Sequence, residues 1–248
     1  MADGSLAGLR LAVTAAAELP LDECLVGVVT MEAGDQAVTV SSRLNLIEGD
    51  LTVDVAGPAG YTARCAWPWP VDALSRSTEL APGQRLLGAI PLLATDTSAP
   101  LFPAVGDYSV VASFTATPDV TLRSPPVTVR RTAPGSGARA GALRERDVLQ
   151  SLLSASVLGD AGPGLALLDE ADTVTTRALS ALAQDRLDQL VSSLDAGDSR
   201  SAAAAVTAVA AVLPPGVADG DPRRAPLEDL LDEGSDEARL FRGFPDPT

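Results

Sequence analysis

Apolar and polar residues alternate with a period of two through the first half of the chain, as in strands with one buried face. Leu51, Val53 and Val55 occupy every second position, and the residues between them, Thr52 and Asp54, are polar. Eight segments of this kind, separated by turn signals, are predicted as strands: residues 9–14, 24–31, 37–46, 51–55, 61–67, 85–93, 108–115 and 120–130. Their spacing of about eight to twelve residues predicts an antiparallel β-sandwich or barrel rather than βαβ units.

The period changes after residue 131. Residues 132–142 carry the Pro, Gly and Ser content of a linker. Beyond them, apolar residues recur at helical spacing from 143 to 158, and two further helices are predicted within 172–213. Three short helices make a small core, so we expect them to dock on the sandwich or on another subunit.

The pattern therefore predicts an α+β chain of several parts. An N-terminal β-sandwich, residues 1–131, is followed by a linker, residues 132–142, and by a small α-helical domain, residues 143–216. The last part, residues 217–248, has no periodic core pattern and is rich in acids, so it is predicted to be a partly extended tail.

The charge of the chain limits the classes of partner that it can bind. Acids number 33 against 18 basic residues, all of them Arg, and the net charge is −15. Nucleic-acid binding needs a basic patch that releases counterions, so we expect no nucleic acid as partner. The longest apolar run, 202–213, is too short to cross a bilayer. The start of the chain lacks a positive cluster, which favours a cytoplasmic location over secretion.

The absence of His and Lys limits the chemistry. Without them there is no imidazole base or ligand, no phosphate-binding lysine and no Schiff base. We therefore expect no enzyme activity and no cofactor. A pair of carboxylates could still hydrolyse a glycoside, so a carboxylate-dependent hydrolase stays open.

The sequence offers two cysteines and several acidic clusters, but no metal site. Cys24 and Cys65 are interpreted as two buried thiols, with a single bridge as the alternative. The acids at 22–23, 169–172 and 185–188 lack the spacing and the glycine of a calcium loop, so they are interpreted as helix caps and solvated faces.

One short motif resembles a known superfamily. In Gly106–Ala112, Tyr108 opens a late strand after a turn, which is similar to the tyrosine corner of immunoglobulin-like and fibronectin-like domains. The Pro82-Gly83 turn and the segment Ser124–Val129 resemble the entries to an earlier and a last strand of such domains. The resemblance covers about half of the chain, residues 9–131. It implies the fold, with the Tyr hydroxyl bonded to backbone just upstream, and not a function.

Trp67 and Trp69 stand out in a chain with only 3% aromatic residues. On an extended segment they point to the same side, so two coplanar indoles could stack a sugar or a proline-rich peptide. The alternative is a plug at the end of a strand, with the neighbouring prolines blocking edge pairing.

The tail combines acids with apolar anchors. Residues 227–233 could fold as an amphipathic helix into a partner's groove, or could cover the helical domain of the same chain. The residues predicted to bind a partner are Leu227, Leu230, Leu231, Leu240, Phe241 and Phe244.

Taken together, the sequence predicts a non-enzymatic protein–protein interaction, scaffold or assembly component. Its expected partners are other proteins, further copies of the chain or a larger assembly. The first alternative is a carbohydrate- or peptide-binding module that uses Trp67 and Trp69. The second is the carboxylate-dependent hydrolase.

Overall fold

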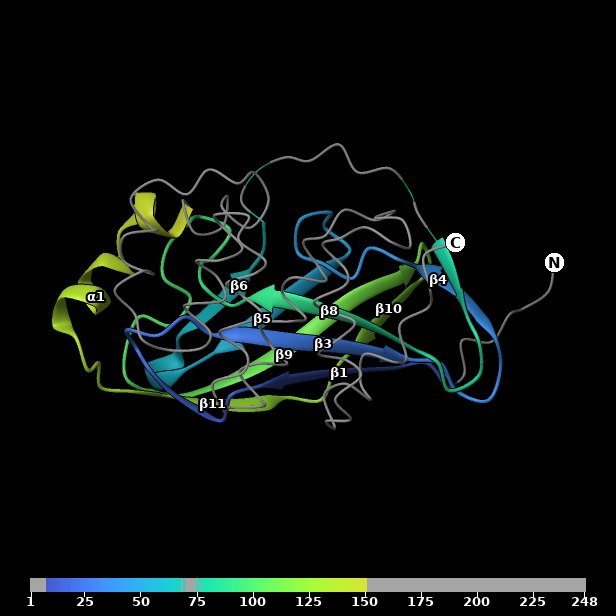
Figure 1. The fold of residues 1–248 in the computed structure, drawn as a ribbon, viewed down its shortest axis with the longest axis horizontal. Helices are drawn as coiled ribbons and strands as arrows, with labels where there is room; N and C mark the ends of the chain where they lie inside the picture. Colours follow the sequence, from blue (N-terminus) through green and yellow to red (C-terminus); the bar gives the residue numbers. More distant parts are fainter. Residues whose placement is uncertain (1–7, 68, 70–74, 76, 151–248) are drawn as a thin grey trace, which may run out of the picture.

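The computed structural model describes residues 8–67, 69, 75 and 77–150, which form a β-sandwich followed by a short helical segment (Figure 1). The strands in chain order are β1 (Arg10–Ala15), β2 (Glu18–Pro20), β3 (Val26–Glu32), β4 (Val38–Ser41), β5 (Leu51–Ala56), β6 (Thr62–Cys65), β7 (Ser77–Leu80), β8 (Arg85–Pro91), β9 (Gly106–Thr117), β10 (Val120–Arg123) and β11 (Val127–Thr132). A 3-10 turn η1 (Pro58–Gly60) precedes β6, and the helix α1 (Gly137–Ala142) follows β11.

Two main sheets face each other. The first sheet has the order β1-β3-β8, and the second has the order β2-β11-β9-β5-β6, with β10 also paired to β9. A small third sheet joins β4 to β7. In immunoglobulin lettering, β1, β3 and β8 take the places of strands A, B and E, and β5, β9 and β11 take those of C, F and G. The predicted β-sandwich is confirmed.

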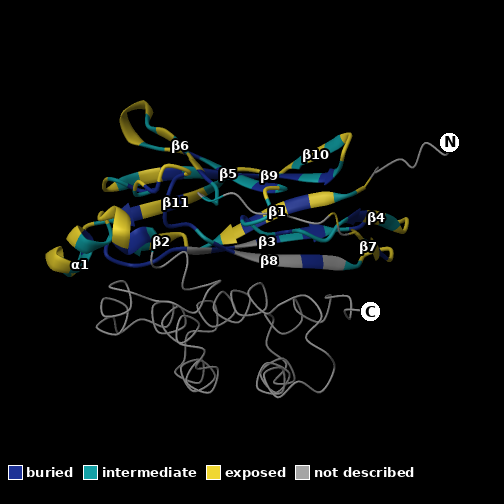
Figure 2. Cartoon of the chain, turned by 90° about the horizontal axis from the view of Figure 1, so that it is seen from above, coloured by how far each residue is buried: buried dark blue, intermediate teal, exposed yellow. Residues whose placement is uncertain are grey.

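The core lies between the two main sheets and follows the predicted alternation. Every second residue of β9 from Tyr108 to Ala116 is buried, and Val29 and Met31 of β3 face them with no exposed surface. Figure 2 shows these buried positions, drawn dark blue, along the strands of both layers. Small and branched apolar residues therefore fill most of the core of a chain that is poor in aromatics.

Two predicted strands are too long. The strand predicted over 37–46 ends at Ser41, and the one predicted over 120–130 is split into β10 and β11. The split falls at Pro125 and Pro126, which have no N–H to continue the ladder. There the Ser124 hydroxyl accepts a hydrogen bond from Ala112 N at 3.0 Å. The short strands β2 and β7 were not predicted.

The segment after β11 is folded against the sandwich. Part of the predicted linker, residues 132–142, forms α1, and residues 146–150 are helical again. These five residues lie within the first predicted helix, 143–158. Residues 143–145, where that helix was predicted to begin, form a turn instead. The predicted helical domain beyond residue 150 and the whole acidic tail lie outside the described residues, so both stay predictions.

Candidate interaction site

Asp22, in the turn after β2, is the centre of the contact between the sandwich and the segment that follows it. Its side chain is 2% exposed. One carboxylate oxygen accepts a hydrogen bond from Gly135 N at 3.0 Å. The other accepts bonds from Ser136 N at 2.8 Å and Arg139 Nη2 at 3.0 Å. One buried carboxylate therefore joins chain segments that are 113 to 117 residues apart.

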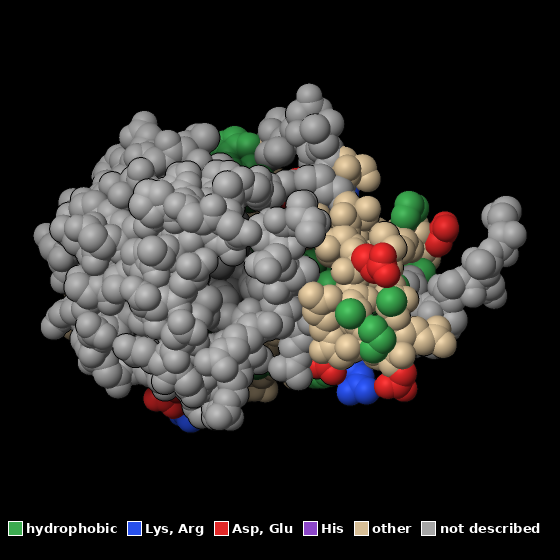
Figure 3. Space-filling model, turned by 45° about the vertical axis from the view of Figure 1, so that its right-hand side comes forward, with side chains coloured by type: hydrophobic (Ala, Val, Ile, Leu, Met, Phe, Trp, Pro, Cys, Tyr) green, Lys and Arg blue, Asp and Glu red, His purple; other side chains and the backbone are tan. Residues whose placement is uncertain are grey.

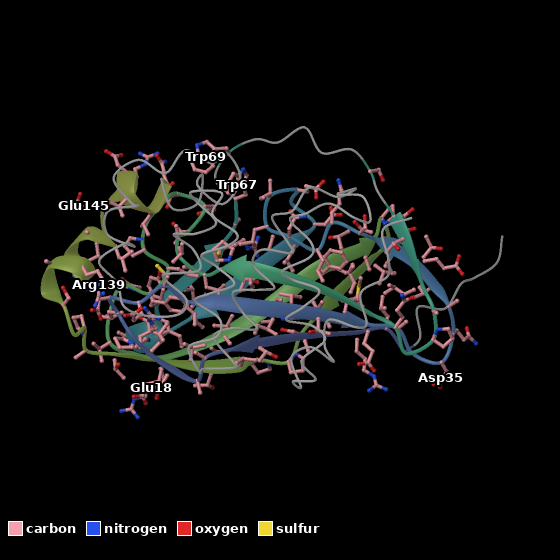
Figure 4. All side chains as sticks on the ribbon, in the orientation of Figure 1. Glu18, Asp35, Trp67, Trp69, Arg139 and Glu145 are labelled. Carbon is pink, nitrogen blue, oxygen red and sulfur yellow. The ribbon has the colours of Figure 1, made fainter. Side chains whose placement is uncertain are left out.

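The local sequence explains why a helix begins at this place. Ser136 is the N-cap of α1, with extended backbone, and its hydroxyl accepts a hydrogen bond from Arg139 N at 3.3 Å. Serine is among the preferred N-cap residues because its oxygen satisfies a free N–H of the first turn. The cap turns the Arg139 side chain toward Asp22, at the end of the sandwich shown on the left in Figure 4.

The electrostatics of the site favour a charged Asp22. Burial alone would raise the pKa of the carboxyl group, but the hydrogen bonds from Ser136, Gly135 and Arg139 outweigh burial and lower the pKa. Glu23 also faces Arg139, with 3.9 Å between Oε1 and Nη2. Arg139 thus offsets part of the negative charge at this site, which leaves Asp22 a hydrogen-bond acceptor at neutral pH.

A second arginine lies deeper in the same end of the sandwich. Arg131 of β11 is only 3% exposed, and its Nη2 donates a hydrogen bond to the backbone oxygen of Glu23 at 2.7 Å. Its guanidinium lies 5.3 Å from the centre of the Phe102 ring. Burial lowers the pKa of Arg131 to about 10, so the group stays a cation at neutral pH. This bond ties β11 to the turn that carries Asp22.

The tyrosine corner supports this end of the sandwich. The Tyr108 hydroxyl donates to the backbone oxygen of Ala104 at 2.8 Å and accepts from Ala104 N at 3.2 Å. Gly57 makes room for the ring, because a Cβ there would lie 2.3 Å from a ring carbon of Tyr108. Phe102 packs edge to face on the same ring, with 5.0 Å between ring centroids. The predicted bond to backbone just upstream is confirmed.

Further contacts extend the attachment along the segment 133–150. Arg144 Nη2 donates to the backbone oxygen of Pro103 at 3.0 Å, and Gln150 Nε2 donates to the Ser98 hydroxyl at 3.0 Å. Val148 and Leu149 are buried. The segment is therefore fixed to the sandwich at both of its ends. We call the surface formed by Asp22, Glu23, Ser98 and Pro103 the docking surface.

The sequence did not reveal the docking surface. The acids at 22–23 were interpreted as solvated or capping residues, and this is wrong, because Asp22 is 2% and Glu23 8% exposed. Their neighbours in sequence give no signal, since the groups that bind Asp22 come more than 110 residues later. Within the described residues, no group of three or more acids and cysteines could hold a metal ion.

Trp67 and Trp69 lie together just beyond β6, where Figure 4 labels them. Both are half-buried, and their ring centroids are 4.8 Å apart with an interplanar angle of 67°. The rings meet edge to face, so the expected coplanar arrangement is wrong. The indole N–H of Trp67 is buried and has no hydrogen-bond partner among the residues that the structure describes. Ligand stacking on this pair stays a prediction.

Both cysteines are buried, and no disulfide joins them. Burial raises the pKa of Cys24 to about 12, and it raises the pKa of Cys65 to about 12 as well. A thiol with such a pKa is a poor nucleophile and a poor metal ligand. The interpretation of two buried thiols is confirmed.

The remaining predicted site residues, Leu227, Leu230, Leu231, Leu240, Phe241 and Phe244, lie outside the described residues. In the part of the face in Figure 3 that belongs to described residues, acidic and basic side chains lie side by side at the lower edge. Among the helices described, none is long and apolar enough to span a membrane.

The solved structures to which this chain is similar include the following two. The sporulation control protein Spo0M of Bacillus subtilis is 11% identical, with 60% of this chain and 54% of that chain covered and a TM-score of 0.30. The CARDB domain of the PF1109 protein of Pyrococcus furiosus, solved with di-metal ions, is also 11% identical; the match covers 50% of this chain and 87% of that chain, at a TM-score of 0.27.

The match to Spo0M spans about half of that protein's length. No protein-family model and no curated protein matches the chain. The assignment of the fold therefore rests on this chain's own strand order and tyrosine corner.

Proposed function

We propose that the chain is a non-enzymatic scaffold protein whose β-sandwich holds and orients the C-terminal part of the chain for protein partners. The observation that carries this proposal is the attachment of residues 133–150 to the docking surface. Asp22 alone accepts three hydrogen bonds from that segment.

A fixed attachment has a different consequence from a flexible linker. A linker rich in Gly and Ser lets the two parts of a chain move independently. Here the hydrogen bonds of Asp22 at one end and Gln150 at the other give the chain a set direction where it leaves the sandwich. Pre-orienting a binding segment lowers the entropy lost when a partner binds, which is what a scaffold achieves.

The partner-binding residues belong to the acidic tail in this proposal. Leu227, Leu230 and Leu231 have the spacing of anchors on one face of a short helix, and acids stand between and after them. An apolar groove with a basic rim is the surface that such a segment fits. Aromatic anchors such as Phe241 and Phe244 are the residue types that contribute most at interfaces.

The full chain with a Leu230→Asp/Leu231→Asp double substitution tests the role of the tail. The matched control is Thr62→Asp/Thr128→Asp, which adds the same charge at two exposed positions of the sandwich. We expect the wild type and the control to retain the same protein from native lysate, and the tail variant to lose it. Equal recovery with the tail variant would reject the tail as the binding segment.

The tryptophan pair supports a second candidate function. The two half-buried rings contact each other, and within the described part of the chain the buried N–H of Trp67 has no acceptor. A sugar or a proline-rich peptide offers both a flat apolar face and hydrogen-bond acceptors. Because these are the only two Trp residues of the chain, intrinsic fluorescence reports on this site alone.

A fluorescence titration with glycans and proline-rich peptides tests this candidate. We expect a spectral shift in the wild type that disappears in Trp69→Ala and persists in Tyr61→Phe, an aromatic control at the opposite end of β6. A silent titration together with an empty glycan array would dismiss ligand stacking.

The state of the cysteines supports one further prediction, the location of the protein. Two unbridged thiols are compatible with a reducing compartment, which supports a cytoplasmic location. A hydrolase needs a general acid with a raised pKa, whereas the pKa of Asp22, one of the two acids at the docking surface, is lowered. The docking surface therefore supports a binding role over a hydrolytic one.

A further inference from the structure

The loop between β8 and β9 contacts both the edge of a sheet and residues 133–150, which we call the docked segment. β6 is the last strand of the second sheet, so its outer edge has no partner strand among the described residues (Figure 1). At β6, the backbone oxygen of Arg64 accepts a hydrogen bond from Asp96 N at 3.3 Å. Two residues later, the Ser98 hydroxyl accepts the bond from Gln150. One short turn therefore joins β6 to the docked segment.

The hydrogen-bond register shows that the bond from Asp96 lies on the outer edge of β6. Gly57 N donates to Tyr61 O where the hairpin of β5 and β6 begins, and bonded pairs alternate along an antiparallel ladder. The backbone groups of Thr62 and Arg64 therefore point away from β5. Groups at such an edge can pair with a strand of another chain, and a covering loop prevents this pairing. The bond from Asp96 is a cover of this kind.

The base of the loop is fixed by the sandwich itself. Ala94 pairs with Pro100 as an isolated bridge, and the Tyr61 hydroxyl donates to the backbone oxygen of Leu101 at 3.1 Å. Neither contact involves the docked segment, so both can persist when that segment leaves. The part of the loop that the docked segment can influence is its tip, residues 95–99, which we call the loop tip.

The loop tip is tightly folded and carries backbone strain. Thr95 N donates to Ala99 O at 2.8 Å, and the Thr95 hydroxyl accepts a bond from Ala99 N at 3.1 Å. Within this turn Ser98 has a φ of 61°, in the left-handed region that favours glycine. A residue with a Cβ is disfavoured there by a factor of about 5 to 30. Other contacts must therefore hold the loop tip in this conformation, and the bond from Gln150 is one of them.

The bond between Gln150 and Ser98 forms where little water can replace it. Ser98 is 3% exposed, and Leu149, next to Gln150, is 1% exposed. A hydrogen bond to a buried hydroxyl contributes more than an exposed one, because its loss leaves the hydroxyl without a partner. The docked segment therefore stabilises the strained turn at Ser98 directly.

We propose that the docked segment locks the loop tip over the edge of β6. With Gln150 bound to Ser98, the loop tip keeps its left-handed turn and Asp96 covers the backbone of Arg64. When the docked segment leaves, the turn relaxes and the edge becomes open to an extended strand. This lock, which rests on the attachment of the docked segment under the proposed function, transmits the position of that segment to the sheet.

Amide hydrogen exchange of the full-length chain, resolved by NMR at the Asp96 N–H, tests the lock. Gln150→Ala removes the donor to Ser98, and the matched control Gln36→Ala removes an exposed glutamine between β3 and β4. One hydrogen bond contributes a factor of about two to ten. We expect exchange at Asp96 to be faster by this factor in Gln150→Ala and unchanged in the control. Exchange at Ala63, which pairs with β5, should stay unchanged in both variants.

A second pair of variants separates the bond at Ser98 from the strain. Ser98→Ala loses the acceptor and keeps a Cβ in the left-handed region, whereas Ser98→Gly loses the acceptor and the strain together. We expect Asp96 to exchange about fivefold faster in Ser98→Ala than in Ser98→Gly. Equal exchange in these two variants would overturn the lock, because strain would then not drive the loop tip open.

Two further results distinguish failure of the lock from failure of the proposed function. Equal exchange at Asp96 in Gln150→Ala, Gln36→Ala and the wild type, with the docked segment protected, would overturn the lock alone. Exchange of the docked segment at the rate of an unfolded chain in the wild type would overturn both the lock and the attachment on which the proposed function rests.

Discussion

Asp22 and Asp50 each bind an arginine, but they act over very different distances along the chain. Asp50 accepts two hydrogen bonds from Arg43, at 2.6 and 2.7 Å, and closes a loop of the same region, since Arg43 is only seven residues away. Asp22 binds Arg139, 117 residues away, and two backbone N–H groups before it. Asp50 therefore organises a loop, whereas Asp22 joins two parts of the molecule.

The two aspartates also differ in the solvent exposure of their side chains. The side chain of Asp22 is 2% exposed and that of Asp50 is 13% exposed. Removing a buried acceptor leaves its donors without water, whereas a partly exposed donor can be hydrated. The comparison therefore predicts that the two carboxylates differ in their contribution to the free energy of unfolding.

Replacement of Asp22 should have the largest effect. In Asp22→Ala, the N–H groups of Gly135 and Ser136 and the guanidinium of Arg139 lose a shared acceptor. Breaking a buried ion pair lowers the free energy of unfolding by about 3 kcal/mol. Urea denaturation of the full-length chain measures this free energy of unfolding. A decrease smaller than that caused by Asp50→Ala would contradict the account.

Lowering the pH should weaken the attachment of residues 133–150 by protonating Asp22, with a smaller effect than replacing this residue. The pKa of Asp22 is lowered in the folded chain from its usual value of 3.8. The stability contributed by its ionised form is therefore present above that value and is lost as the pH falls through the lowered pKa. Limited pepsin digestion should cut within 133–150 of the wild type only in strong acid. Cleavage of Asp22→Asn with the same pH dependence would show that another group controls the attachment.

Replacement of Asp50 should have a moderate effect. Asp50→Ala removes both bonds from Arg43 and the bond from the Ser41 hydroxyl at 2.7 Å. Because the site is partly exposed, we expect the free energy of unfolding to fall by roughly 1 kcal/mol. Exchange in peptides covering 41–50 should rise while exchange in 133–150 stays unchanged. A change in both regions would mean that the loop and the docking surface are coupled.

Replacement of Arg64 should have the smallest effect. Its side chain is 56% exposed, and the ion pair with Asp54 lies on the outer face of the second sheet. Exposed pairs of this kind contribute at most about 0.5 kcal/mol. Arg64→Ala should leave the midpoint of urea denaturation almost unchanged. A shift as large as that of Asp50→Ala would show that solvent exposure does not determine how much each ion pair contributes to the free energy of unfolding.

The features that the sequence predicted are local ones. The alternation of Leu51, Val53 and Val55 predicted β5 almost to the residue, because burial of one strand face needs no knowledge of its partner. Tyr108 bonds to a residue only four positions away, so its motif was visible in a short stretch. The boundary between β10 and β11 was missed although Pro125 and Pro126 marked it.

The docking surface depends on partners that lie far apart in sequence. Nothing near Asp22 distinguishes it from a solvated acid, and nothing near Gly135 and Ser136 distinguishes a docked turn from a linker. The parallel pairing of β2 with β11 and the bond from Arg131 to the backbone of Glu23 bring the two segments together. Short parallel pairings leave little pattern in the sequence. The sequence therefore carries no sign that the segment predicted to be a linker is held against the sandwich and contains α1.

The central claim is that residues 133–150 and the sandwich form one unit held by Asp22. Hydrogen–deuterium exchange of peptides covering 133–150, compared among the full-length wild type, Asp22→Asn and Asp50→Asn, measures it most directly. The account predicts protection in the wild type and in Asp50→Asn, and faster exchange in Asp22→Asn alone. Exchange of these peptides at the unprotected rate in the wild type, or equal protection in all three proteins, would contradict it.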